Sequence, residues 1–134
     1  MNLNHFINTF EEGSKKEVLN QIQSLLATEE KIFFHLLDQG KFKKNVEEVI
    51  DIDKNNPVMV ATKITNDGRY ITLFTDEKLA YDLKEEGFRV AYQTGVKAVE
   101  FASILKNIDG VTFQATTAYL SIEKEDVIKL LINS

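Results

Sequence analysis

The chain has 134 residues, 43% hydrophobic and 28% charged, a balance typical of a globular domain that excludes a disordered chain. It lacks cysteine, which excludes disulfides, thiolate nucleophiles, Cys-ligated zinc and iron–sulfur clusters. The net charge is −5 with bases interleaved among acids, so nucleic acid is not expected as a partner. No apolar stretch approaches the roughly 20 residues of a membrane helix and no secretory signal is found, so we expect a cytoplasmic protein that does not bind membranes.

The first part of the chain predicts two helices. The apolar residues of the first helix fall three and four positions apart, at Leu3, Phe6, Ile7 and Phe10. The second helix begins after Ser14, whose hydroxyl can accept a hydrogen bond from the amide of Glu17, as in a capping box. We therefore expect N-terminal helices over 1–27 and a mixed α/β body over 31–134.

The middle of the chain predicts strands. An apolar run over 31–37 ends at a polar turn that contains Gly40. Two β-branched runs, over 58–65 and 69–74, are joined by Asn66-Asp67-Gly68, and Asp-Gly between such runs is the strongest short-range signal of a β-hairpin. A central hairpin is therefore expected.

The rest of the chain alternates helices and strands. Thr75 can cap a helix that Gly87 would end, and a strand over 88–92 follows. Further elements are expected as a helix between Thr94-Gly95 and Asp109-Gly110, strands over 111–115 and 118–122, and a closing helix from 123. This order predicts an α+β fold, in which a mixed, largely antiparallel sheet with a central β-hairpin is covered by helices on one face.

Catalytic motifs are absent from the sequence. The two histidines, His5 and His35, lie in no motif that requires an imidazole, and no serine lies in a nucleophile elbow. We therefore expect no enzyme. The alternative is a small-ligand-binding protein or an enzyme whose pocket is assembled from dispersed residues around His35, with acids such as Asp51 or Asp53.

Ion and cofactor sites are also not expected. Asp51, Asp53 and Asn55 match the first ligand positions of a calcium loop, but Asn56 replaces its glycine and Thr62 its bidentate glutamate. The six glycines form no phosphate-binding motif, so we expect no cofactor and no metal. The cluster of Lys41, Lys43 and Lys44 is more simply explained by a solvated turn or a charged edge strand than by an anion or nucleic-acid patch.

Tyrosines are the best candidates for a contact surface, because a phenol tolerates water at one end and exposed tyrosines are enriched at interfaces. The sequence contains four of them: Tyr70, Tyr81, Tyr92 and Tyr119. We expect these residues to mark a partly exposed interaction surface.

A segment at the hairpin resembles a known family. Residues 68–79, Gly-Arg-Tyr-Ile-Thr-Leu-Phe-Thr-Asp-Glu-Lys-Leu, are similar to the N-terminal domain of the SseB family, named for enhanced serine sensitivity. The resemblance extends from about the second helix to the end of the chain. It implies one small, bacterial, cytosolic SseB-like α+β domain over 1–134, without established catalytic residues.

These observations favour a non-enzymatic protein-binding or accessory module, regulatory or similar to an immunity protein that masks a basic target. Its expected partner is another protein. Self-assembly through an edge strand into a homo-oligomer is a further option.

Overall fold

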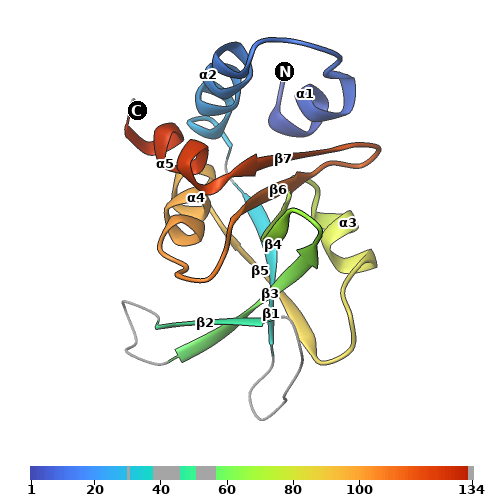
Figure 1. Cartoon of the computed structure of the whole chain (residues 1–134). Coiled ribbons are helices and arrows are strands. Elements are labelled where there is room, and N and C mark those ends of the chain that lie inside the picture. The colour runs from blue at the N-terminus through green and yellow to red at the C-terminus, as the bar shows by residue number, and fades with distance from the viewer. Residues whose placement is uncertain (30, 38–45, 51–56, 133–134) are drawn as a thin grey trace.

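A computed structural model describes residues 1–29, 31–37, 46–50 and 57–132, and within these ranges it contains five helices and seven strands (Figure 1). The helices are α1 (Leu3–Thr9), α2 (Lys15–Leu26), α3 (Glu77–Asp82), α4 (Gly95–Ser103) and α5 (Lys124–Ile132). The strands are β1 (Ile32–Leu37), β2 (Val46–Ile50), β3 (Pro57–Thr65), β4 (Gly68–Phe74), β5 (Phe88–Gln93), β6 (Gly110–Gln114) and β7 (Tyr119–Glu123). The predicted α+β class is confirmed.

The seven strands belong to one mixed sheet. Its main path runs in the order β2-β3-β1-β4-β6-β7, and β5 pairs along the whole of β1. Every pair is antiparallel except β4–β6, which is parallel, and the chain between these two strands contains α3, β5 and α4. Among the described strands β7 pairs only with β6, so it forms one edge of the sheet.

The predicted central hairpin is formed by β3 and β4, with Thr65 opposite Gly68 at its turn. Gly68 has a φ of 130°, a backbone conformation that residues with a Cβ rarely adopt, which explains the glycine. At its other end the hairpin opens, and β1 pairs with both of its strands. The hairpin is therefore central, as the Asp-Gly signal indicated.

Two hydrophobic clusters fill the space between the sheet and the helices. The larger cluster contains Phe34 and Phe113 and packs against α1, α2, α4 and α5. The smaller contains Phe33, Phe74 and Ala80 and lies under α3. Because neighbouring residues of a strand point to opposite faces, Phe33 and Phe34 place α3 on the face opposite the other four helices. The expectation that helices cover one face only was therefore wrong.

The strand β2 was not predicted. It consists of Val46–Ile50, and its sequence, Val-Glu-Glu-Val-Ile, has two adjacent glutamates and no alternation of apolar and polar residues. It pairs with β3 as the other edge of the main path. The calcium-like segment over 51–55 and the cluster of Lys41, Lys43 and Lys44 lie outside the described residues.

The ends of α3 also differ from the prediction. The N-cap is Asp76, whose Oδ2 accepts a hydrogen bond from the backbone N–H of Leu79 at 2.9 Å. The hydroxyl of Thr75 instead donates to Oδ1 of Asn4 at 2.7 Å, which links the end of β4 to α1. The helix ends at Asp82, and Gly87, with a φ of 91°, lies in the following turn.

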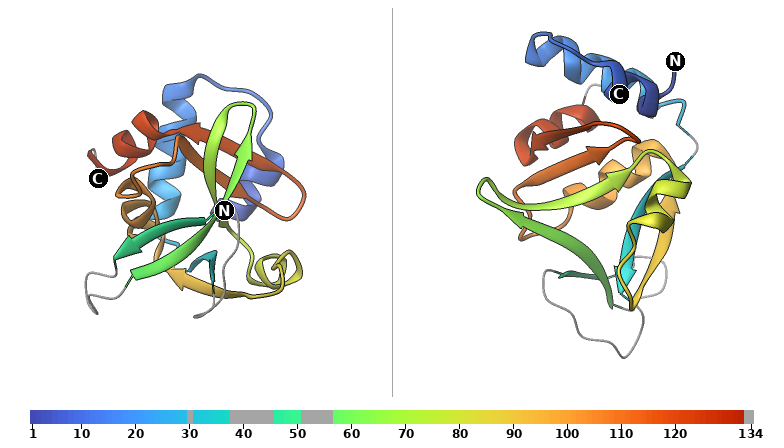
Figure 2. Two further views of the ribbon diagram at one scale, coloured as in Figure 1. Left: turned by 60° about the horizontal axis from the view of Figure 1, so that its bottom comes forward. Right: turned by 90° about the vertical axis from the view of Figure 1, so that its right-hand side faces the viewer.

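The first helix is fastened to the turn between β6 and β7. Oδ1 of Asn8 accepts hydrogen bonds from N–H and Oγ1 of Thr117, at 2.8 and 3.0 Å, and Nδ2 of Asn8 donates to Oγ1 of Thr116 at 2.6 Å. Asn4, one turn earlier, accepts from the N–H of Thr116 at 3.2 Å. These contacts hold α1 and the following chain above β7, as the right-hand view of Figure 2 shows.

Candidate functional site

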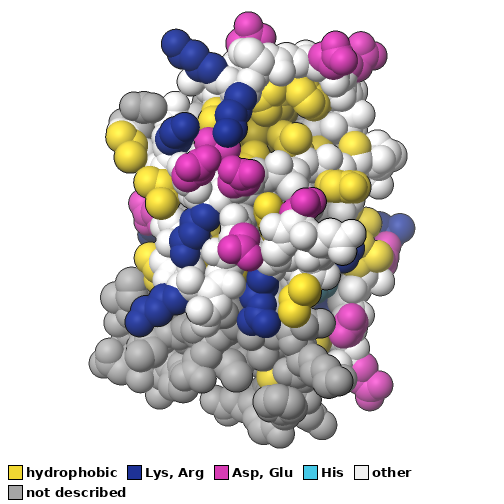
Figure 3. Space-filling model, in the orientation of Figure 1, with side chains coloured by type: hydrophobic (Ala, Val, Ile, Leu, Met, Phe, Trp, Pro, Cys, Tyr) yellow, Lys and Arg dark blue, Asp and Glu magenta, His cyan; other side chains and the backbone are white. Residues whose placement is uncertain are grey.

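A cavity of about 300 Å³ opens between the α1–α2 connection, the start of α2, β7 and the start of α5. We call it the β7 groove. Its lining residues are Phe10, Lys15, Val18, Leu19, Leu120, Ser121, Ile122, Glu123 and Asp126. Hydrophobic side chains gather in the upper part of the face seen in Figure 3, where α1, α2 and β7 meet, and acidic side chains lie above and below them.

The groove runs along β7, which is an edge strand among the described strands. Four consecutive residues of this strand, from Leu120 to Glu123, line it. Side chains of a strand alternate between its two faces, so a cavity over one face alone would be lined by every second residue. Backbone atoms of β7 therefore contribute to the lining together with its side chains.

The pairing of β7 fixes which backbone groups point outward. In the turn, the N–H of Ala115 donates to the carbonyl of Ala118 at 2.9 Å, so Ala118 is directed toward β6. In an antiparallel pair this direction alternates along the strand. Leu120 therefore also bonds to β6, while Tyr119 and Ser121 direct both N–H and C=O away from it. No hydrogen bond from another described residue reaches these four groups.

The apolar lining comes from both helical and strand residues. Phe10, Val18, Leu19 and Leu120 are half-buried, and Ile122 is 8% exposed. Their places follow from the helices that carry them. Phe10 ends the apolar stripe of α1, and Val18 and Leu19 lie one turn after Ser14, the N-cap of α2. Their partial exposure leaves apolar surface at the groove that no described side chain covers.

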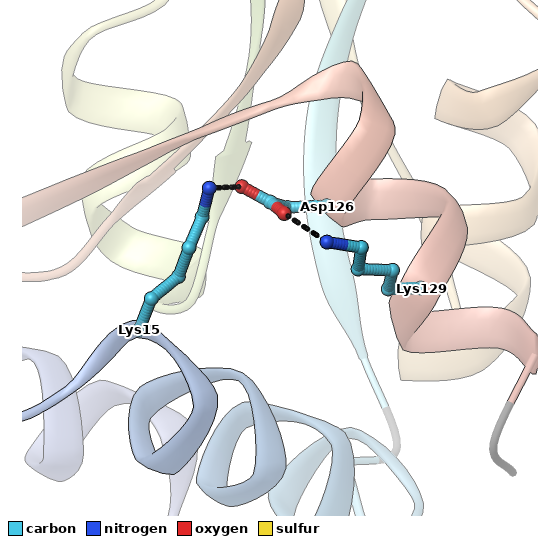
Figure 4. A network of polar contacts seen from close by, with 3 residues as sticks. All are labelled: Lys15, Asp126 and Lys129. Carbon is cyan, nitrogen blue, oxygen red and sulfur yellow. Dashed lines mark ion pairs between the residues drawn. The ribbon is translucent and has the colours of Figure 1, made fainter.

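At its α5 end the groove closes on a charged cluster (Figure 4). The carboxylate of Asp126 is 2% exposed, and its Oδ2 lies 2.9 Å from Nζ of Lys15 on α2. Its Oδ1 lies 3.4 Å from Nζ of Lys129 and has no hydrogen-bond partner among the described residues. The hydrogen bond and the negative charge of Asp126 raise the pKa of Lys15. The pair joins the start of α2 to the first turn of α5.

Three carboxylates meet at this end, from Glu123, Glu125 and Asp126, with oxygens within 4.8 Å of one another. Divalent hard cations prefer such oxygen ligands. Both oxygens of Asp126, however, already face lysine ammonium groups, which a cation would have to displace. We therefore assign no metal to this cluster.

The four tyrosines do not form one surface. Tyr81, Tyr92 and Tyr119 are 55%, 56% and 68% exposed and lie on α3, β5 and β7. Tyr70 is 8% exposed, and burial raises the pKa of its phenol, so its expected exposure was wrong. The ring of Tyr70 lies against Gly110, where a Cβ would come within 2.4 Å of it. Tyr119 is the only one of the four in the strand that borders the groove.

His35 is held in a structural position. Its Nε2 lies 2.7 Å from the carbonyl of Ala80, and its ring packs on Phe74 with centroids 4.7 Å apart. Burial lowers the pKa of His35, which favours a neutral imidazole that donates to Ala80. The acids proposed to act with it, Asp51 and Asp53, lie outside the described residues. His5 is exposed on α1.

The lowered pKa of His35 predicts a pH dependence of stability. The unfolded chain binds a proton near pH 6.5, whereas the folded chain keeps His35 neutral to lower pH. The contribution of His35 is therefore complete above about pH 6.5 and is lost as the pH falls below it. Urea denaturation between about pH 8 and pH 5 should show a steeper loss of stability for the native chain than for His35→Gln. Equal slopes would contradict this assignment.

Sequence reasoning missed the buried Asp126 and the groove beside it. Asp126 lies in the first turn of α5, where acidic side chains are common because they interact favourably with the helix dipole, so its position alone does not indicate burial. A usable signal was its position four residues before Leu130 and next to Val127, on the stripe of α5 that is buried. The groove had no such signal, because it depends on which strand forms the edge of the sheet.

No family model matches the chain, and no curated protein or solved structure is similar enough to be matched to it. In the described part of the chain, no helix is long and apolar enough to cross a bilayer.

Proposed function

We propose that this chain is a non-enzymatic, cytoplasmic protein-binding module and that the β7 groove is its contact surface. The observation that carries the proposal is the half-buried apolar lining of the groove, together with backbone groups of β7 that form no hydrogen bond with another described residue. Apolar surface of this kind, rimmed by polar residues, marks interaction sites. The absence of cysteine agrees with a reducing compartment.

The charge around the groove favours a basic partner. Glu11 and Glu12 line a second hollow, which shares Phe10 with the β7 groove. Glu123 and Glu125 lie at the opposite end of the β7 groove, near α5. No ion pair joins these four acids to another described residue. Complementary charge guides association, so a regulatory or immunity-like role toward a basic target follows from the same surface.

The alternative function, a ligand site or active site around His35, gains less support. A ring nitrogen of His35 is occupied by Ala80, and the ring itself is packed against Phe74. A catalytic base needs its nitrogen within reach of a substrate proton. This arrangement favours the protein-binding proposal.

The resemblance to the SseB family stays a prediction. It implies an α+β domain, and the fold of the chain is of this class. Self-assembly through an edge strand also stays an option, and light scattering of the purified chain would detect it.

Affinity capture from cytosolic extract with matched variants tests the proposal. Leu19→Asp puts a charge into the apolar lining, and Leu83→Asp makes the same change at an exposed residue at the end of α3. We expect a partner that the native chain and Leu83→Asp retain at low salt, and that Leu19→Asp loses by tenfold or more (~1.4 kcal/mol of binding energy). Thermal melts of both variants serve as the folding control. A partner retained equally by Leu19→Asp would contradict the proposal.

A further inference from the structure

Resting on the proposed function, the geometry points to a mode of binding and a class of partner. We propose that an extended, basic segment of a partner protein pairs with the open edge of β7 and inserts one apolar side chain into the β7 groove. The segment would extend the sheet beyond β7, as in recognition by strand addition.

The backbone of β7 supplies the first argument. Tyr119 and Ser121 point N–H and C=O outward, and an added strand could pair with these four groups. The strand has five residues and spans roughly 17 Å, so it would pair with a segment of similar length. Native proteins usually protect such edges with charge, proline or a covering element. Here no described residue forms a hydrogen bond with the outward N–H and C=O groups of Tyr119 and Ser121.

The size of the groove supplies the second argument. A volume of about 300 Å³ is at the lower limit of ligand pockets and suits one large side chain. A docked helix would need a row of positions for residues at i, i+3, i+4 and i+7. Side chains on the same face of a strand are two residues, or about 6.6 Å, apart, so an added strand can insert one of them into the groove while its neighbours lie outside it. The groove therefore fits an extended segment better than a helix.

Charge defines the chemistry of the segment. Acids lie at both ends of the groove, with Glu11 and Glu12 near the α1–α2 connection and Glu123 and Glu125 near α5. The base that lines the groove, Lys15, is already bound to Asp126. Lysine or arginine on both sides of the apolar residue would therefore complement the site. A second copy of this chain is disfavoured, because its β7 would bring a further Glu123 to the acids.

A display library of random peptides, screened on the immobilised full chain, tests this inference without a known partner. We expect enriched peptides to alternate apolar and polar residues and to carry lysine or arginine on both sides. Replacement of these bases by glutamate should weaken binding by about tenfold or more, and added salt should weaken it as well. Enrichment of acidic peptides would overturn the inference.

Hydrogen exchange by NMR then tests the strand pairing. In the free chain the amides of Tyr119 and Ser121 should exchange rapidly, and the bound peptide should slow them, while Leu120, bonded to β6 throughout, is the internal control. Methylation of the peptide nitrogens that face β7 should weaken binding by about tenfold, and methylation of the alternate nitrogens should not. The same peptides should lose affinity for Leu19→Asp.

The outcomes separate the two proposals. Peptides that lose affinity for Leu19→Asp but leave the exchange of Tyr119 and Ser121 unchanged would keep the groove as the binding site and overturn strand addition. Failure to enrich any peptide that is sensitive to Leu19→Asp would overturn strand addition, and the capture experiment would still test the proposed function. A dimer that competes with the peptides would identify a second copy as the occupant and overturn the basic segment.

Discussion

Replacement of both lysines that face Asp126, as Lys15→Met with Lys129→Met, is expected to cause a large loss of stability at neutral pH. The carboxylate of Asp126 is 2% exposed, and these two ammonium groups are its ion-pair partners among the described residues. A buried carboxylate without a counter-charge is costly, so the loss should clearly exceed the ~1 kcal/mol that an exposed ion pair contributes at most. Methionine keeps the length and apolar character of each side chain, so the lost charge is the main change.

Two further variants make this prediction sharp. Addition of Asp126→Leu to the double variant should recover most of the loss, because a fully apolar replacement of a buried ion pair is often neutral. Lys78→Met removes an exposed partner of Asp82, at 3.9 Å, and should have almost no effect. Urea denaturation measures all three. A double variant as stable as Lys78→Met would show that Asp126 does not need its lysines.

Phe113→Ala is expected to lower the free energy of unfolding by about 3 to 5 kcal/mol, as for other fully buried aromatic residues. Phe113 lies on β6 opposite Leu120 of β7, within the cluster that packs α1, α2 and α5 on the sheet. Its loss would leave a cavity next to Leu120, which lines the β7 groove. We therefore expect the variant to lose binding at the groove together with stability.

Phe101→Ala is the matched control for this prediction. Phe101 is half-buried on α4 and stacks on Phe34 with ring centroids 5.0 Å apart. Phe101→Ala removes the same atoms from a less buried position, so it should lower the free energy of unfolding by clearly less than Phe113→Ala does. Urea denaturation of both variants measures the difference, because at an unchanged m-value a shift of the denaturation midpoint reports a change in stability. Equal losses for both variants would contradict the central place of Phe113 in the core.

Short sequence motifs predicted the hairpin and the start of α2, because each depends on residues next to one another in the chain. Asp67-Gly68 predicted the hairpin because the turn needs a glycine with positive φ, and Ser14 predicted the start of α2, where its hydroxyl accepts from Glu17 at 3.2 Å. Thr75 and Asp76 were both possible N-cap residues of α3. Asp76 took the role because Thr75 donates to Asn4, a residue 71 positions away. No local pattern contains that contact.

The candidate site could not be predicted for a related reason. It depends on β7 as the edge strand, and this follows from the parallel pairing of β4 with β6 across the intervening chain. The sequence predicted a helix that contains Val18 and a strand that contains Leu120, but not that these two residues would meet at one groove. Tyr70 illustrates the same limit, because its burial arises from contact with Gly110 on the neighbouring strand.

Photo-crosslinking in cells tests the central claim most directly. A photoreactive amino acid would be placed in the β7 groove at Leu19 and, as a control, at the exposed Leu83 on the other side of the sheet. We predict a discrete crosslinked protein from position 19 that position 83 does not give, with the crosslinked peptide rich in lysine or arginine. The absence of a crosslink at position 19, or the same products from both positions, would contradict a function of the β7 groove in protein binding.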